Sequence, residues 1–153
     1  MGYDVHPLRE GRALIIGGVR IEHPTGLDGH SDADVLTHAV IDSVLGAAGL
    51  GDIGAHFPPD DARYRGASSL ELLGEAAKVV ATAGYRVANI DSTVVAQAPR
   101  LGPHLGEMAR NIARSLGLDI AAVSVKATSP EGIGALGAGE GIAAHAVALI
   151  EES

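Results

Sequence analysis

The chain has 153 residues, 46% hydrophobic but only 3% aromatic, so we expect one domain over residues 1–153 with a core of Ala, Val, Leu and Ile. The net charge is -8, and the 11 Lys and Arg residues form no run, which argues against a general nucleic-acid-binding protein. Cysteine is absent, which excludes disulfides and thiolate metal sites, and without a long apolar run or a secretion signal we expect a cytoplasmic protein with no membrane partner.

Residues 2–6 are predicted to form a short strand, whose period of two places Asp4 and His6 on the same face. Such a pair alone is more typical of a surface strand than of a metal site. Joined by a third ligand from a nearby helix, it would hold a metal ion with one coordination position left open. His38 is our candidate for that third ligand.

Two apolar runs, residues 13–16 and 19–21, flank Gly17 and Gly18. A two-residue glycine turn between apolar runs predicts a β-hairpin. The following segment, residues 23–26, is expected to end the strand and to lead into a helix.

That helix is predicted over about residues 32–49, and its entry is rich in ligand-type side chains. An ordinary helix cap, with Ser31 as N-cap and Asp34 at the third position, accounts for these two residues. It does not account for His30 and His38, which favours a functional role for the stretch. Since residues four apart share a helix face, we also hypothesise that Asp34 or Asp42 orients His38.

A loop rich in Gly and Pro, residues 52–61, contains the only Phe of the chain, Phe57. Composition leaves open whether this ring anchors the loop to the core or covers a ligand. Ser68 and Glu71 then form a capping-box pattern that opens a helix, which is predicted to close at Gly84.

The second half of the chain alternates strand and helix patterns. Strands are expected at residues 86–98, 122–127 and 141–150, and a helix is expected from Pro103 to Leu116 with Gly117 as its C-cap. This order indicates an α+β domain with a mixed sheet backed by helices on one face.

Residues 128–141 contain five glycines. Such a loop could bring backbone amides close to a phosphate, and Glu131 within it is a suitable ligand for a hard cation. A flexible connector is an equally good interpretation of this composition.

Six separated segments together resemble the 2-C-methyl-D-erythritol 2,4-cyclodiphosphate synthase family. They run in order over nearly the whole chain: Asp4-Val5-His6, residues 29–38, residues 50–54 with Phe57-Pro58, residues 96–99, residues 125–128 and residues 139–142. No segment is specific alone, but the combination is.

The resemblance implies a homotrimer with its sheets packed around a three-fold axis and its active sites between neighbouring subunits. The implied reaction cyclises 4-diphosphocytidyl-2-C-methyl-D-erythritol 2-phosphate, a cytidine-diphosphate-linked substrate, and releases CMP. The 2-phosphate attacks the β-phosphorus, so the protein needs no covalent nucleophile and chiefly positions the reactants and neutralises charge.

By matched position, the resemblance also implies residue roles. Asp4, His6 and His38 would bind Zn²⁺ or another divalent transition metal, Glu131 would bind Mg²⁺ or Mn²⁺ at the substrate diphosphate, and His30 and Ser129 would stabilise the transition state. The erythritol-phosphate side would involve His30, Ser31, Asp52, Gly54 and Phe57, with Asp61 among the further substrate-binding residues. The cytidine side, contributed by the adjacent subunit, would involve Ala96, Pro99, Lys126, Thr128 and Ser129.

The chain departs from the family pattern at two places. Pro130 stands next to the expected metal ligand and removes an amide donor. The usual Phe-Thr-Gly-Arg is replaced by Ala135 to Ala138, and the lost arginine leaves open whether isoprenoid diphosphates bind on the trimer axis.

Two other functions fit parts of the pattern. A zinc-dependent hydrolase would use the same three ligands to activate water, with Glu131 or His30 as general base. A noncatalytic binding module would result if the altered loop at Pro130 had abolished turnover.

Overall fold

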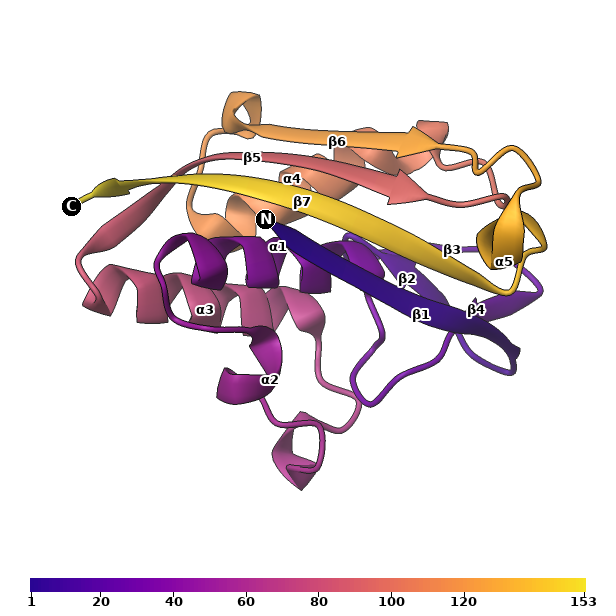
Figure 1. Cartoon of the computed structure of the whole chain (residues 1–153), viewed down its shortest axis with the longest axis horizontal. Coiled ribbons are helices and arrows are strands. Elements are labelled where there is room, and N and C mark those ends of the chain that lie inside the picture. Colours follow the sequence, from indigo (N-terminus) through magenta and orange to yellow (C-terminus); the bar gives the residue numbers. More distant parts are fainter.

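The computed structural model describes the whole chain, residues 1–153, and contains a five-stranded mixed sheet (Figure 1). Its strands lie in the order β4 (Thr25–Leu27), β1 (Gly2–Glu10), β7 (Gly141–Glu152), β5 (Tyr85–Val95) and β6 (Val123–Thr128). Only β5 and β6 pair in parallel, and the other pairs are antiparallel. The predicted mixed sheet is confirmed.

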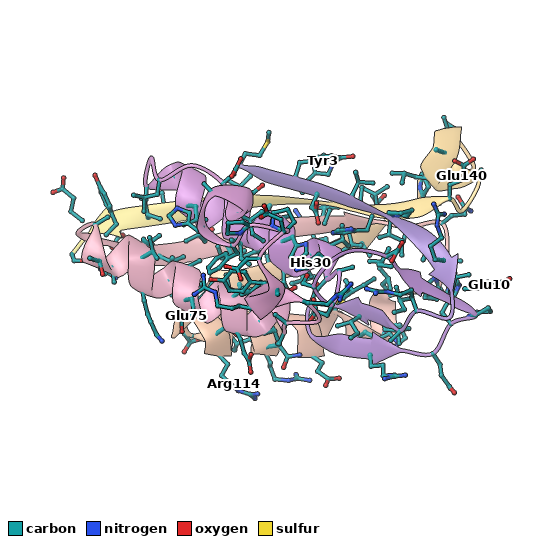
Figure 2. All side chains as sticks on the ribbon, turned by 90° about the horizontal axis from the view of Figure 1, so that it is seen from below. Tyr3, Glu10, His30, Glu75, Arg114 and Glu140 are labelled. Carbon is teal, nitrogen blue, oxygen red and sulfur yellow. The ribbon has the colours of Figure 1, made fainter.

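Three long helices cover one face of this sheet, as Figures 1 and 2 show. They are α1 (Val35–Ala47), α3 (Ser69–Thr82) and α4 (Leu105–Leu116). One cluster of buried aliphatic side chains fills the space between helices and sheet. The prediction of helices backing one face is therefore confirmed, and none of these helices combines the length and apolarity needed to cross a membrane.

Helix α1 packs closely on β1 and β7 because small residues line the contact. Ala39, Ala144 and Ala146 are buried there. A Cβ atom added at Gly2 would meet the backbone oxygen of Ala39 at 1.9 Å, so only glycine permits this approach. The close contact brings residues of α1 near those of β1.

The glycine turn forms the predicted hairpin between β2 (Leu14–Ile16) and β3 (Val19–Ile21). Both central residues have positive φ, 57° for Gly17 and 70° for Gly18. This conformation suits the right-handed twist of the strands and strongly favours glycine.

The start of α1 differs from the prediction. The helix begins at Val35 rather than near residue 32, and Asp34 is its N-cap, with its carboxylate accepting from the backbone N–H of Thr37. Ser31 is therefore not the cap. Ser31 lies three residues before Asp34, and its hydroxyl is directed to His38 instead.

Other boundaries are close to prediction. Ser68 is the N-cap residue of α3, but its side chain makes no capping bond, and Gly117 ends α4 with φ 67° as expected. Pro103 lies in a short 3-10 turn, residues 102–104, before α4. The short strand β4 and the short helices α2 (Ile53–His56) and α5 (Gly134–Gly137) were not predicted.

The face of the sheet opposite the helices is uncovered and carries apolar side chains. Tyr3, Val5, Val147 and Leu149 keep exposed fractions of 49%, 45%, 54% and 58%. In Figure 2, Tyr3 projects from this side of the molecule and Arg114 from the helical side. We call these four residues the open sheet face. Large apolar side chains exposed together on one uncovered face are typical of an interaction surface.

Candidate metal and substrate site

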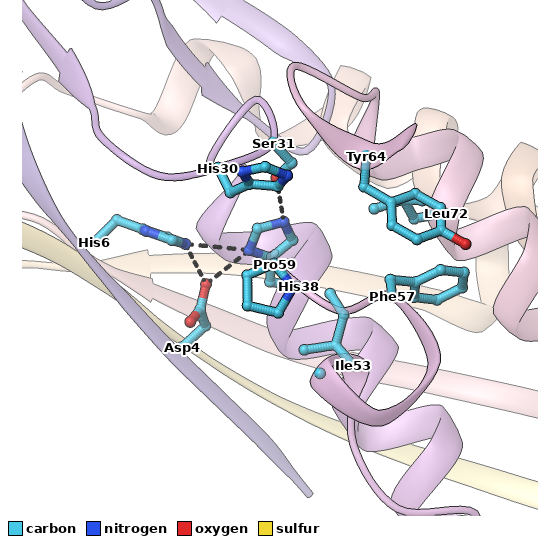
Figure 3. A pocket seen from close by; sticks show the side chains of 11 residues that line it. Asp4, His6, His30, Ser31, His38, Ile53, Phe57, Pro59, Tyr64 and Leu72 are labelled. Atoms are coloured by element: carbon cyan, nitrogen blue, oxygen red, sulfur yellow. Dashed lines mark hydrogen bonds and ion pairs between the residues drawn. The ribbon is translucent and has the colours of Figure 1, made fainter. Parts of the chain in front are cut away.

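Three side chains from β1 and α1 converge on one point (Figure 3). Oδ2 of Asp4 lies 2.9 Å from Nε2 of His6 and 3.1 Å from Nδ1 of His38. The two imidazole nitrogens are 3.1 Å apart. The convergence predicted from the spacing is confirmed.

The local fold explains this convergence. Alternation along β1 turns Asp4 and His6 toward α1, and His38, in the first turn of α1, faces them. The side chains are largely withdrawn from solvent, with exposed fractions of 26% for Asp4, 17% for His6 and 10% for His38. A rigid strand and a rigid helix thus fix all three groups.

The donor set fits a divalent cation. Nδ1 of His6 donates to the backbone oxygen of Asp28 at 2.9 Å, so Nε2 of the neutral ring carries a lone pair that faces the carboxylate of Asp4. Two lone pairs at this distance repel each other unless a proton or a cation lies between them. Tetrahedral coordination with bonds of about 2.0 Å separates ligand atoms by about 3.3 Å, close to the observed spacing.

The protein's electrostatics agree with a positive charge at this point. Burial alone would raise the pKa of Asp4, but hydrogen bonds and charge interactions with His38 and His6 outweigh it and lower that pKa to about 2. For His6, burial acts to lower the pKa, and the neighbouring carboxylate of Asp4 outweighs it, so the pKa is raised. Protonation of the His6 ring is therefore favoured at the point where a cation would bind.

The hypothesis that Asp34 or Asp42 orients His38 is wrong. The buried carboxylate of Asp34 accepts from the backbone N–H groups of Gly17, Gly18 and Thr37, and that of Asp42 accepts from the backbone N–H of Ile53 at 2.7 Å.

Nε2 of His38 instead lies 3.0 Å from Oγ of Ser31 and 2.8 Å from Oγ of Ser69. Ser69 comes from α3, far along the chain, and helical spacing could not have revealed it.

A cleft opens beside the three ligands and has a polar and an apolar side. Its lining residues are Asp4, His6, His30, Ser31, His38, Ile53, Gly54, Phe57, Pro59, Tyr64 and Leu72. The rings of Phe57 and Tyr64 meet edge to face at 5.5 Å and 85°. Phe57 packs against the core and also lines the cleft. From this one position the ring can both anchor the loop and contact a ligand.

His30 closes one side of the cleft. Its Nε2 donates to the backbone oxygen of Asp61 at 3.2 Å, which ties the segment before α1 to the loop after α2. Among the expected substrate-binding residues, the Asp61 side chain pairs with Arg63 and the Asp52 side chain caps α2. Neither carboxylate lines the cleft, whereas Tyr64 and Leu72, which the sequence did not single out, do.

The residues expected on the cytidine side form a second pocket. It lies where the parallel strands β5 and β6 end, a usual position for ligand sites, and it is lined by Ala96, Gln97, Pro99, Arg100, Leu101, Ala127, Thr128 and Ser129. Lys126 is outside this lining, and its Nζ donates to Asp91 at 2.9 Å, which lowers the pKa of Asp91. The first cleft and this pocket share no residue.

Glu131 lies in the loop beside the second pocket. Its backbone is in the left-handed region, with φ 56°, and its N–H donates to Oγ of Ser129 at 2.9 Å. The neighbouring Gly132 donates its N–H to Oε1 of Gln97 at 2.9 Å. The loop is therefore fastened despite Pro130, but neither Ser129 nor Glu131 reaches the first cleft within this chain.

Comparison with known proteins gives one consistent result. A family model described as the YgbB family matches residues 1–151. The 2-C-methyl-D-erythritol 2,4-cyclodiphosphate synthase of Syntrophomonas wolfei is 59% identical over 152 residues, covering 99% of this chain and 97% of the relative. The synthase of the same name from Bordetella petrii is 61% identical over 149 residues, covering 97% of this chain and 92% of the relative.

Solved structures agree with the sequences. The bifunctional IspDF of Campylobacter jejuni superimposes with a TM-score of 0.95 at 43% identity, and the match covers 99% of this chain but 41% of that longer chain. A 2-C-methyl-D-erythritol 2,4-cyclodiphosphate synthase in its CDP-bound form matches with a TM-score of 0.89 at 35% identity, over 98% of this chain and 97% of that one. The chain belongs to the YgbB family, the family of the 2-C-methyl-D-erythritol 2,4-cyclodiphosphate synthases.

Proposed function

We propose that the protein converts 4-diphosphocytidyl-2-C-methyl-D-erythritol 2-phosphate to 2-C-methyl-D-erythritol 2,4-cyclodiphosphate with release of CMP. The single observation that carries the proposal is the metal-ligand triad of Asp4, His6 and His38 at the mouth of a cleft, in a chain whose relatives bear this synthase's name. The enzyme is then a phosphorus-oxygen lyase of isoprenoid precursor biosynthesis.

The triad would hold Zn²⁺, since one carboxylate and two imidazoles are a donor set that zinc prefers and three protein ligands leave a position open. When bound, the ion supplies Lewis-acid stabilisation of charge on the β-phosphate. Glu131 would hold Mg²⁺ or Mn²⁺ with the substrate diphosphate, because a carboxylate suits hard cations.

The chain's own residues position the substrate. The apolar wall of Ile53, Phe57 and Leu72 suits the methylated carbon skeleton, and His30 and Ser31 offer polar groups on the opposite side. In the transition state the 2-phosphate oxygen approaches the β-phosphorus as CMP departs. Donor groups of His30 and Ser129 would stabilise the charge on the transferring group.

We infer a homotrimer in which each active site lies between two subunits. The expected active-site residues fall into two separate sets within one chain, which supports this inference. The ligand triad and Phe57 line the first cleft, whereas Ala96, Pro99 and Thr128 line the second pocket. One copy's second pocket placed over a neighbour's cleft would bring Ser129 and Glu131 to the metal. The open sheet face supplies an apolar surface for the trimer axis.

The hydrolase alternative is not favoured, because the relatives are named as synthases. The two reactions differ in their oxygen balance. Incubation with the cytidylated substrate in isotopically labelled water should yield CMP and a cyclic product without labelled oxygen. A linear, labelled product would support a hydrolase, and absence of any turnover would support a binding module.

A variant tests the role of the triad. His38→Ala should abolish Zn²⁺ binding and cyclisation while the assembly stays intact, since His38 is not on the open sheet face. His104→Ala, whose ring is outside both pockets, is the matched control and should keep both properties. Full activity of His38→Ala would contradict the proposed site.

A further inference from the structure

We propose that Ser69 and Asp32 act as a pair of positioning residues that fix the ring of His38 in the tautomer whose Nδ1 is free for the metal. The inference rests on the proposed function for the presence of a metal, and on the hydrogen bonds behind His38 for everything else. Ser69 is completely buried, and Oγ of Ser69 lies 2.8 Å from Nε2 of His38.

The direction of these hydrogen bonds follows from Asp32. Its carboxylate accepts from the hydroxyl of Ser69 through Oδ1 and from the backbone N–H of Ser69 through Oδ2 at 3.0 Å. A carboxylate only accepts, so the single hydroxyl proton of Ser69 is committed to Asp32. Oγ of Ser69 then has only lone pairs left for Nε2 of His38, which must carry the proton and donate.

Ser31 cannot set this direction. Its Oγ lies 3.0 Å from Nε2 of His38 and accepts from the backbone N–H of Ala33, but no carboxylate takes its proton. The hydroxyl of Ser31 is therefore able to donate to the ring or to accept from it. Without Ser69, it would permit the tautomer with a proton on Nδ1, which blocks the metal.

The pair is itself held in place by two elements. Oδ1 of Asp32 also accepts from the backbone N–H of Asp34, the N-cap of α1, at 3.2 Å. Ser69 is the first residue of α3. The start of α3 is thus joined to the start of α1 through Asp32, and the metal ligand lies one turn into α1. A metal-binding imidazole commonly has its outer nitrogen held in this way by a carboxylate or another polar group.

The test compares Ser69→Ala with Ser43→Ala. Ser43 is also a completely buried serine hydroxyl, but it donates to the backbone oxygen of Val40 within α1 and has no link to the site. In the metal-free wild type at a pH where the imidazoles are neutral, nitrogen NMR of labelled histidine should show His38 protonated at Nε2. In Ser69→Ala we expect a mixture with the Nδ1-protonated form.

The second measurement is the Kd for Zn²⁺, titrated alone in competition with a chelating dye. Ser69→Ala should raise it about 10- to 100-fold, and Ser43→Ala should leave it unchanged. Asp32→Asn, which keeps the shape of the side chain, should also raise the Kd and shift the tautomer. Thermal unfolding of each variant separates these effects from loss of the fold.

Three results would overturn the proposal: a wild-type His38 protonated at Nδ1, or a Ser69→Ala variant with an unchanged tautomer, or one with an unchanged Kd. The tautomer is read in the metal-free protein. It therefore tests the hydrogen-bond pair even if the protein bound no zinc, in which case the proposed metal role fails by itself.

Discussion

The carboxylate of Asp4 and Nε2 of His6 lie 2.9 Å apart, and the space that they share with His38 favours a positive charge. The pKa of His6 is raised, so this space favours a proton on the ring when no cation is bound. Entry of a metal cation requires its release. The proton and the metal thus compete for one centre.

We expect Zn²⁺ affinity to fall as the pH is lowered through the raised pKa of His6, because the protonated ring cannot coordinate. Loss of one competing proton corresponds to at most about tenfold in Kd per pH unit. Calorimetry from about pH 8 to about pH 6, in buffers of different ionisation enthalpy, would measure Kd and the released proton. A constant Kd over this range would contradict the competition.

Without a bound metal, the stability of the fold should change with pH in the opposite direction, falling as the pH rises. The pKa of His6 is higher in the folded state than its ordinary value of 6.5, so its interaction with Asp4 stabilises the fold fully below pH 6.5. This contribution is lost as the pH rises through the raised pKa. Asp4, with its pKa lowered to about 2, keeps its own contribution until strongly acidic pH.

Ala33 is a strained residue at the entry to α1. Its φ is 56°, in the left-handed region, and the residue is completely buried. Ala33→Gly relieves about 1–2 kcal/mol of backbone strain but loses a buried methyl group of about 0.8 kcal/mol and adds chain entropy, so we expect a net change within about 1 kcal/mol.

Ala33→Val tests the same backbone strain by increasing it. A β-branched residue is far less compatible with positive φ, and the buried position has no room for it, so we expect a loss of at least about 3 kcal/mol. Denaturant unfolding of both variants measures the difference. Equal stabilities would show that the backbone at this position is free to relax.

At the level of elements, Asp34 joins the hairpin β2–β3 to the start of α1. Its buried carboxylate accepts from Gly17 at 2.8 Å, from Gly18 at 2.7 Å and from Thr37 at 3.0 Å. All three N–H groups would lose their partner in Asp34→Ala. Gly17 and Thr37 are buried, whereas Gly18 is exposed. Since each unsatisfied buried donor costs about 1–3 kcal/mol, we expect a loss of at least about 2 kcal/mol in the free energy of unfolding.

The control for this change is Asp119→Ala. Asp119 caps an exposed 3-10 turn through the N–H of Ala121, so its removal should cost about 1 kcal/mol or less. Chemical denaturation of the two variants, monitored by circular dichroism, gives both values. Similar losses in the two variants would mean that Asp34 is an ordinary surface cap.

The sequence predicted these elements where a local rule applies. Periodicity located α1, α3 and α4, the paired glycines located the hairpin, and alternation located Asp4 and His6 on one face. Rules of this kind fail where the partner is distant in sequence. Asp34 was assigned to an inner position of the helix because its distant partners, Gly17 and Gly18, are invisible to a helical pattern.

The same limit applies to the site. The triad could be predicted because a strand repeat and one histidine of a helix sufficed, but Ser69 lies 31 residues from His38 and reaches it through tertiary packing alone. Likewise, Tyr64 enters the cleft from a short 3-10 helix, Ala62–Tyr64, and Leu72 enters it from α3, and the positions of both depend on the whole core.

For the whole molecule, the open sheet face gives a test of assembly. We expect Val147→Asp to dissociate the proposed homotrimer, because burying a second carboxylate beside Asp91, the residue opposite Val147 on β5, would cost several kcal/mol at each interface. Light scattering after size-exclusion chromatography would show monomers. Arg114→Asp, on the opposite, helical side, should stay assembled (Figure 2). A monomeric unmodified protein, or a trimeric Val147→Asp variant, would contradict the proposed interface.

The ligand triad lines the first cleft and Ser129 lines the second pocket, and the two share no residue. A substitution can therefore disable one of these sites and leave the other intact. His38→Ala and Ser129→Ala chains, each inactive alone, should complement one another when they are unfolded and reassembled together. With equal amounts of the two chains, random mixing would place an intact triad opposite an intact loop at about a quarter of the interfaces between subunits. The activity of a mixed assembly would then depend on whether its two kinds of chain are damaged at the same site or at different ones.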